Sequence, residues 1–273
     1  MTTDDNPQAA QMADESMVRT LAAQAAALWP EERPLFERYQ LPAAPHILDA
    51  GCGTGQMTAR LAAHFPPASL LGIDVQDGSL DRARHSAAAA GLAGRVSYEH
   101  RSIYATGLPD GAFDLTVCRH VLQSIPHAER AIAELLRLTR RGGTLHLLVE
   151  DYGMIHFSRG RLDPDAFWRQ AQTYGASTGT DMFVGRNTPG ILHRLGLTAV
   201  TMDYLVVDTV RTPRQTFVDI WTAWRDGYVD ALGQHTALTR GQAVDHFNDM
   251  IDTLRDPAGY AVWLVPVVSA TVP

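Results

Sequence analysis

One short segment constrains the fold more than any other: an apolar run that ends in a cluster of glycines. His46–Ala50 (HILDA) is apolar with an acid near its end, and the glycine-rich GCGTG follows directly. Gly51, Gly53 and Gly55 stand where such a chain must turn, and glycine lets the backbone turn tightly and approach a ligand closely. The pattern predicts a buried strand that leads through a glycine turn into a helix over Met57–His64.

The same alternation of strands and helices continues for about a hundred residues. Further short apolar runs predict strands at 70–75, 96–100, 113–118 and 144–150. Helical patterns occupy 79–91 and 128–139. The segment Arg140-Arg141-Gly142-Gly143 is expected to close the second of these helices, since basic residues and glycine suit a helix C-terminus. Repeated alternation of this kind predicts a parallel sheet with helices on both faces.

Helical patterns flank this core on both sides. The pattern from Ala13 to Arg38 predicts two helices, because Pro30 and Pro34 interrupt it. Towards the end of the chain, two apolar runs predict strands at 197–207 and 260–269. About fifty residues separate these two strands, which is too long for a hairpin loop in a compact sheet. We interpret them as a helical excursion that forms a cap together with the N-terminal helices.

Composition narrows the classes of function. The chain has 273 residues, and its formal net charge of −7 argues against a nucleic-acid partner, because such proteins neutralise phosphates with a basic face. Cys52 and Cys118 form no CxxC pair, and the histidines show no HExxH or HxH pattern, so we predict no metal. No apolar run approaches the ~20 residues needed to span a bilayer. The acidic, polar N-terminus lacks the features of a signal peptide, and we expect a cytoplasmic protein without membrane partners.

Two acids sharpen the meaning of the glycine turn. Asp49 lies just before the turn, and Asp74 ends the next predicted strand. An acid at the end of the second strand, such as Asp74, can accept hydrogen bonds from both ribose hydroxyls of an adenosine ligand. Nicotinamide-dependent oxidoreductases share this acid, but their G-x-G-x-x-G fingerprint differs, because Gln56 stands at the sixth position here. The spacing favours a ligand without a pyrophosphate, and an oxidoreductase remains the alternative.

Together with further motifs, these residues make the chain resemble a known family. ILDAGCGTG, GIDV, LPDGAFDLTVCRHVLQSIP and LLRLTRRGGTLHLL, in this order over about residues 45–150, resemble the successive motifs of class I S-adenosylmethionine-dependent methyltransferases. The resemblance implies a Rossmann-like α/β fold: a doubly wound, mostly parallel seven-stranded sheet with the last strand antiparallel, plus a helical cap from N-terminal and C-terminal insertions. The expected divisions are a helical lid (1–40), the S-adenosylmethionine-binding core (41–150), a cap segment with a core helix (151–196) and the last two strands (197–273) with a helical insertion at about 212–256.

The resemblance also implies how S-adenosylmethionine, and its product S-adenosylhomocysteine, would be held. Asp49 would help to bind the methionine ammonium, directly or through water. The backbone of the glycine turn (Gly51, Gly53 and Gly55) would pass beneath the methionine and the ribose. Asp74 would bind the ribose hydroxyls, with Val75 against the adenine.

Three further positions carry implications from the resemblance. Ser102 and Ile103 follow the third predicted strand, where many family members have an Asp that contacts the adenine amino group. Ser102 departs from that pattern, which leaves the backbone N–H of Ile103 as the expected contact. Arg119 follows the fourth strand, where a backbone carbonyl commonly meets the cofactor. The alternative for the Arg119 side chain is a surface ion pair.

The transferred methyl group is already activated on the cofactor, so the protein must supply orientation and electrostatics. A base is needed only if the acceptor keeps a proton at neutral pH. Candidates follow the carboxyl ends of the strands, where open α/β sheets bind ligands. His120 and His156 are the candidate bases, and the alternative for both is a packing role. Glu150 is a candidate for attracting a cationic amine.

Aromatic residues outside the core suggest a flat or apolar small-molecule acceptor. Candidates for contact with it are Trp29, Tyr152, Trp168 and Trp224, although such residues more often only fill a core. The sequence leaves oxygen, nitrogen and carbon methylation open. It also leaves open a homodimer through the cap and a methyltransferase-like binding module without turnover.

Overall fold

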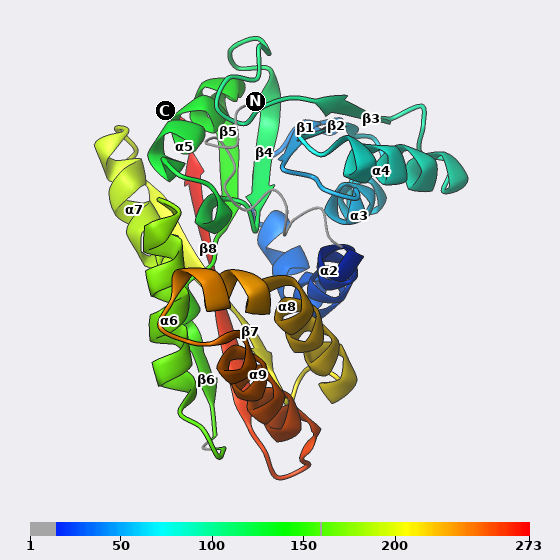
Figure 1. Cartoon of the computed structure of the whole chain (residues 1–273). Coiled ribbons are helices and arrows are strands. Elements are labelled where there is room, and N and C mark those ends of the chain that lie inside the picture. The colour runs from blue at the N-terminus through cyan, green and yellow to red at the C-terminus, as the bar shows by residue number, and fades with distance from the viewer. Residues whose placement is uncertain (1–14, 159) are drawn as a thin grey trace.

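Strands and helices alternate along the chain as the sequence predicts (Figure 1). The structure is a computed structural model that describes residues 15–158 and 160–273. Its strands are β1 (His46–Ala50), β2 (Ser69–Asp74), β3 (Val96–His100), β4 (Phe113–Arg119), β5 (Thr139–Leu148), β6 (Ile155–Phe157), β7 (Val200–Asp208) and β8 (Ala261–Thr271). Its α-helices are α2 (Glu15–Phe36), α3 (Gln56–His64), α4 (Asp77–Ala89), α5 (Ala128–Leu138), α6 (Pro164–Ser177), α7 (Val184–Arg194), α8 (Arg214–His235) and α9 (Arg240–Arg255). Two short 3₁₀ turns are η1 (Leu122–Ser124) and η2 (Tyr152–Met154).

The described strands form one mixed sheet. Its order is β3-β2-β1-β4-β5-β8-β6, and β7 pairs with the other edge of β8. The strands β1 to β5 pair in parallel, whereas β8 runs antiparallel to β5, β6 and β7. The predicted mostly parallel sheet with an antiparallel last strand is therefore confirmed. The structure has one strand more than the predicted seven. This strand, β6, has only three residues, too few for a pattern to predict it.

The strand order places several loops at one edge of the sheet. β1 lies between β2 and β4, with Ala50 opposite both Ile73 and Cys118. The next residues of all three strands therefore emerge side by side. Because the chain crosses to opposite sides of β1 after β1 and after β3, this edge is a topological switch point, where open α/β sheets bind ligands.

The N-terminal segment forms one helix rather than the predicted two. α2 runs without a break through Pro30 and Pro34. A proline inside a helix removes a main-chain hydrogen bond and ordinarily costs about 3 kcal/mol. Burial of the helix offsets this cost, because Leu28 and Leu35 lie in the aromatic core beside α8. Tertiary packing thus overrides the local signal.

The RRGG segment does not close a helix as predicted. α5 ends at Leu138, and β5 begins at Thr139 with an irregular pairing to β4. Arg140 Nε donates a hydrogen bond to Asp114 Oδ1 at 2.5 Å, and Gly142 adopts a φ of +71°. The segment is therefore the distorted first part of a strand, which its ion pair with β4 holds against the sheet.

The helices α2, α6, α8 and α9 form what we call the helical layer. In Figure 1, α6, α8 and α9 lie beside β6, β7 and the adjoining part of β8, away from α3 and α4. The layer packs around its own aromatic core, in which Trp221 and Trp263 are fully buried. α8 and α9 lie between the last two strands in sequence, and Thr239 begins α9 with a capping box to Gln242. A helical excursion is thus present where the sequence predicts it.

Candidate active site

A cleft opens at the carboxyl ends of β1, β2 and β4. Counting its mouth, it encloses about 1060 Å³. Gly51, Gly53 and Asp74 line it from the sheet, and Gln24 of α2 and Tyr228 of α8 line it from the helical layer. The cleft therefore lies between the switch point of the sheet and the helical layer.

The glycine turn after β1 requires glycine for two physical reasons. Gly51, Gly53 and Gly55 all have positive φ, at +74°, +50° and +76°, which other residues adopt only with strain. A Cβ atom added to Gly51 would also lie 2.3 Å from Val121 Cγ2. Gly51 and Gly53 line the cleft, whereas a Cβ on Gly55 would meet the hydroxyl of Tyr98 at 2.5 Å. The structure thus brings two of the three predicted glycines to the cleft.

Asp74 lines the cleft from the end of β2. Its Oδ2 accepts a hydrogen bond from the backbone N–H of Gly53 at 2.8 Å, and its Oδ1 accepts from Val75 at 2.7 Å and from Gln76 at 3.0 Å. Burial raises the pKa of Asp74, although these three donors act in the opposite direction. Because a carboxylate has about four acceptor positions, the three bonds fix its orientation and leave capacity for a ligand hydroxyl. Val75 lines the cleft beside it.

Asp49 lies behind the glycine turn and does not line the cleft. Its side chain is fully buried, and its Oδ2 accepts a hydrogen bond from Thr58 Oγ1 at 2.6 Å. Burial raises the pKa of Asp49 to about 6, against the lowering effects of Thr58 and Arg119. The structure therefore gives Asp49 a supporting position beneath the turn, and its predicted contact with an ammonium group remains a prediction.

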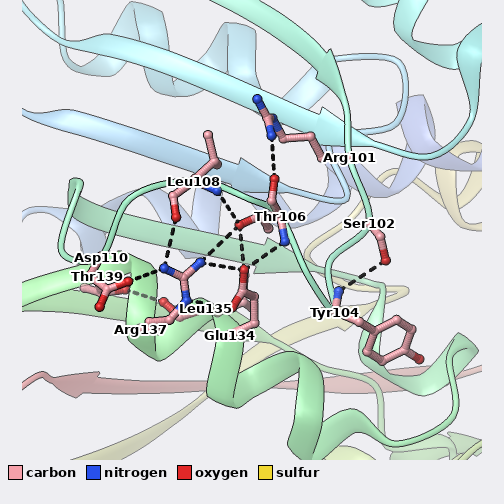
Figure 2. Close-up of polar contacts among 10 residues, drawn as sticks. All are labelled: Arg101, Ser102, Tyr104, Thr106, Leu108, Asp110, Glu134, Leu135, Arg137 and Thr139. Carbon is pink, nitrogen blue, oxygen red and sulfur yellow. Dashed lines mark hydrogen bonds and ion pairs between the residues drawn. The ribbon is translucent and has the colours of Figure 1, made fainter.

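The loop after β3 carries Ser102 and Ile103, and both line the cleft. Figure 2 shows how α5 holds this loop. Thr106 donates to Glu134 Oε1 through its backbone N–H at 2.8 Å and its hydroxyl at 2.6 Å, and Arg137 Nε donates to Glu134 Oε2 at 2.8 Å. The hydrogen bond from Arg137 lowers the pKa of Glu134 to about 2, despite partial burial. The position of Ser102 and Ile103 thus depends on the ion pair of Glu134 and Arg137 on α5.

Arg119 lines the cleft at the end of β4, but its guanidinium turns towards α2. Its Nε donates to Glu32 Oε1 at 2.8 Å, and its Nη2 lies 2.7 Å from Glu32 Oε2. Both side chains are buried, so the ion pair lies in the interior and not on the surface. Glu32 Oε1 also lies 3.0 Å from His146 Nε2. Burial would raise the pKa of Glu32, but Arg119 and His146 lower it to about 2.

His120 forms a buried polar chain with Glu150 and Trp263. The ring Nδ1 of His120 lies 2.5 Å from Glu150 Oε1, and Trp263 Nε1 donates to Glu150 Oε2 at 3.1 Å. His120 has a φ of +55° and lines the cleft. Its Nε2 is buried and has no hydrogen-bond partner within the described residues. The chain therefore ends in an imidazole nitrogen without a partner, on a residue that lines the cleft.

Two residues predicted for the site lie elsewhere. His156 is exposed on β6, where it pairs with Val262, and it is not part of the cleft lining. Trp29 packs against Phe36 and His64, with ring centroids 5.9 Å apart in both pairs. The structure therefore does not bring either residue to the cleft.

The remaining predicted aromatics lie at or near the cleft. Tyr152 and Trp224 line it, and Trp168 lies in a smaller adjoining space. Among the lining residues that the sequence did not single out are Leu21, Gln24, Gln123 and Ser124. Of these, Gln123 is buried with no partner for its Oε1 in the described part of the chain. Gln123 and Ser124 lie in the motif around the fourth predicted strand, which was the available signal for them. The residues of α2 gave no such signal, because which face of a helix meets the cleft depends on packing.

Neither a metal site nor a membrane span is present among residues 15–158 and 160–273. No group of three or more His, Cys, Asp or Glu side chains in these ranges is placed to hold a metal ion. No helix in them is both long and apolar enough to cross a bilayer.

A doubly wound sheet, a glycine turn and an acid at the end of the second strand meet in one cleft, the arrangement of class I S-adenosylmethionine-dependent methyltransferases. Residues 47–143 match a family model described as a methyltransferase domain. The chain is 28% identical over 221 residues to trans-aconitate 2-methyltransferase of Methylobacterium nodulans, covering 80% of this chain and 75% of that protein. The family-model match and this relative support a class I S-adenosylmethionine-dependent methyltransferase, a family that takes S-adenosylmethionine as the methyl donor.

Solved structures share the fold over most of the chain. The [4+2]-cyclase SpnF is 22% identical with a TM-score of 0.53, covering 86% of this chain and 80% of that one. A geranyl diphosphate C-methyltransferase from Streptomyces coelicolor, bound to S-adenosyl-L-homocysteine, is 16% identical with a TM-score of 0.56, covering 89% and 79%. Other curated relatives match over a shorter stretch, and the chain covers only 25% to 45% of their lengths.

Proposed function

We propose that the chain transfers a methyl group from S-adenosylmethionine to an oxygen atom of a small molecule bound between the sheet and the helical layer. The observation that carries this proposal is that one cleft joins Asp74 and the glycine turn to His120. Methyl transfer is an in-line displacement, so the donor and acceptor sites must adjoin. A continuous cleft with both sets of residues meets that requirement.

The donor half of the cleft suits S-adenosylmethionine. Asp74 has acceptor capacity for a ribose hydroxyl, and the turn at Gly51 and Gly53 lets a ligand approach the backbone closely. Ile103 lines the same cleft, and its backbone N–H is the proposed contact to the adenine. When bound, the cofactor supplies the activated methyl group, and the protein's part is to orient the reactants and exclude water.

The acceptor half contains a base. Because Glu150 Oε1 accepts a hydrogen bond from the N–H at His120 Nδ1, the neutral ring keeps its lone pair at Nε2. The buried carboxylate of Glu150 also stabilises the imidazolium that forms when Nε2 accepts a proton. A hydroxyl must lose its proton during methylation, whereas a neutral amine needs no base. This chain of residues therefore favours an oxygen acceptor over a neutral amine nitrogen.

The helical layer acts as the cap in this proposal. α2 contributes Leu21 and Gln24 to the cleft, and α8 contributes Trp224 and Tyr228. Residues of both the predicted lid and the predicted insertion thus line the cleft. Residues 1–14 of the predicted lid (1–40) lie outside the described residues. The cytoplasmic location and the homodimer also remain predictions.

The first test separates donor binding from turnover. Calorimetric titration of the purified chain should show binding of S-adenosylhomocysteine and none of NAD; the reverse result would favour an oxidoreductase and end this proposal. The second test incubates the chain with S-adenosylmethionine and matched phenols, alcohols and amines. The methyl group must be found in the product by mass spectrometry, because a cyclase shares this fold. Methylation of amines alone would contradict the oxygen acceptor, and donor binding without any transfer would favour the binding module.

A further inference from the structure

Behind the cleft lies a second, smaller space, which we call the inner chamber. Counting the space open at its edges, it has about 350 Å³ between side chains. Its lining consists of Tyr152, Phe167, Trp168, Ala171, Tyr174, Met182, Trp224, Tyr228, Leu232 and Phe247. None of these residues carries a carboxylate, a guanidinium or an imidazole. A charged ligand group would therefore lose its hydration there without gaining a partner.

The inner chamber adjoins the acceptor half of the cleft. Tyr152, Trp224 and Tyr228 line both spaces. Trp263, which holds Glu150, has its ring centroid 6.0 Å from that of His120 and 5.6 Å from that of Trp224. Trp224, which lines both spaces, is therefore linked to His120 through the single ring of Trp263.

One polar group of the chamber has no partner. Trp168 is buried, and its indole N–H makes no hydrogen bond within the described residues. Leaving a buried donor unpaired is unfavourable, so such a group calls for an explanation. Trp221 has the same unpaired N–H but does not line the chamber. The comparison of these two tryptophans separates a ligand contact from a defect of core packing.

We propose that the inner chamber binds the apolar end of the acceptor, and that an uncharged oxygen at this end accepts a hydrogen bond from Trp168 Nε1. The inference rests on the proposed function, since it takes the His120 end as the place of the reacting hydroxyl. The substrate class is then a neutral molecule with a hydroxyl at one end, an apolar body, and a carbonyl or ether oxygen at the other.

Two phenols of the same shape test this class. 4-(3-oxobutyl)phenol carries a ketone oxygen where 4-(3-methylbutyl)phenol carries a methyl group. Each is titrated calorimetrically into the full chain saturated with S-adenosylhomocysteine. The wild-type chain should bind the ketone about 3- to 10-fold more tightly, as one recovered hydrogen bond of about 1 kcal/mol requires. Trp168→Phe should reduce this preference to less than twofold, and Trp221→Phe should retain it.

A second variant tests the space itself. Ala171→Leu places a larger side chain in the lining of the chamber, and it should weaken both phenols at least tenfold while S-adenosylhomocysteine binds as before. Unchanged binding of both phenols to Ala171→Leu would overturn the proposal, and so would wild-type protein that binds neither. An unaltered ketone preference in Trp168→Phe would also overturn it. Wild-type protein that fails to bind S-adenosylhomocysteine would instead overturn the proposed function.

Discussion

Arg119 Nη2 and Glu32 Oε2 lie 2.7 Å apart in the interior of the protein, between the end of β4 and α2. This contact joins the sheet to the helix that contributes Leu21 and Gln24 to the cleft. Glu32 is fully buried, and it also meets His146 of β5. The position of α2 over the cleft therefore depends on a buried charge network as well as on apolar packing.

Replacing Glu32 should destabilise the fold strongly. Glu32→Gln leaves the buried guanidinium of Arg119 without its counter-charge, and breaking a buried pair in this way typically costs about 3–5 kcal/mol. Urea unfolding of the variant measures the loss. Glu31→Gln is the matched control, because Glu31 is the exposed neighbour on the same helix. Equal stability of the two variants would show that the network contributes little.

The stability of the protein should fall in acid. The pKa of Glu32 and that of Glu134 are both lowered from 4.5 to about 2. A carboxyl whose pKa is lower in the folded state stabilises the fold above its unfolded value and loses this contribution as the pH falls. The free energy of unfolding should therefore decrease between about pH 5 and pH 2, as urea midpoints would show. Glu134→Gln should flatten this dependence only slightly, because Glu134 is partly exposed and its pair is screened; a steeper dependence would contradict the assignment.

Asp49 should have the opposite dependence. Its pKa is raised from 3.8 to about 6, so it favours the folded state below its unfolded pKa, and this contribution is lost as the pH rises through 6. Asp49→Asn removes the buried charge and should raise the stability by about 1–3 kcal/mol at pH 7.5, with little change at pH 4. Thermal unfolding at the two pH values measures this. If Asp49 also holds the donor's ammonium, the same variant should bind S-adenosylhomocysteine more weakly.

Asp74 should contribute most to donor affinity. Asp74→Asn replaces a carboxylate that accepts three backbone hydrogen bonds, and it should weaken S-adenosylhomocysteine binding about 10- to 100-fold, since a bond to a charged group is worth about 1.5–3 kcal/mol. Asp77→Asn serves as the control, because Asp77 is exposed at the start of α4. Similar affinities of the two variants in calorimetry would remove Asp74 from the donor site.

His120 should govern turnover rather than donor binding. His120→Ala should lower the rate of methyl transfer about 10²- to 10⁴-fold, the usual contribution of a general base, with S-adenosylhomocysteine affinity nearly unchanged. Glu150→Gln should lower the rate to a smaller extent, because it weakens the partner of Nδ1 but keeps its shape. His156→Ala should turn over like the wild type, since His156 is exposed on β6. Full activity of His120→Ala would exclude it as the base.

Residue patterns predicted the core well where burial is complete. β1 has the predicted bounds of 46–50, and β4 begins at the predicted residue 113, because short apolar runs in a parallel sheet are buried on both faces. Patterns failed where packing decides the backbone: α2 continues through Pro30 and Pro34, and the RRGG segment joins a strand. Both errors come from local rules that tertiary contacts outweigh.

The sequence by itself determined the glycine turn, the acid after the second strand and the resemblance to a methyltransferase family, because these depend on residue types at fixed spacing along neighbouring strands. Only the tertiary structure paired His120 with Glu150, which are thirty residues apart. It also decided that Leu21 and not Trp29 reaches the cleft from α2. Contacts between distant segments depend on how whole helices and strands pack together, and no local pattern records that packing.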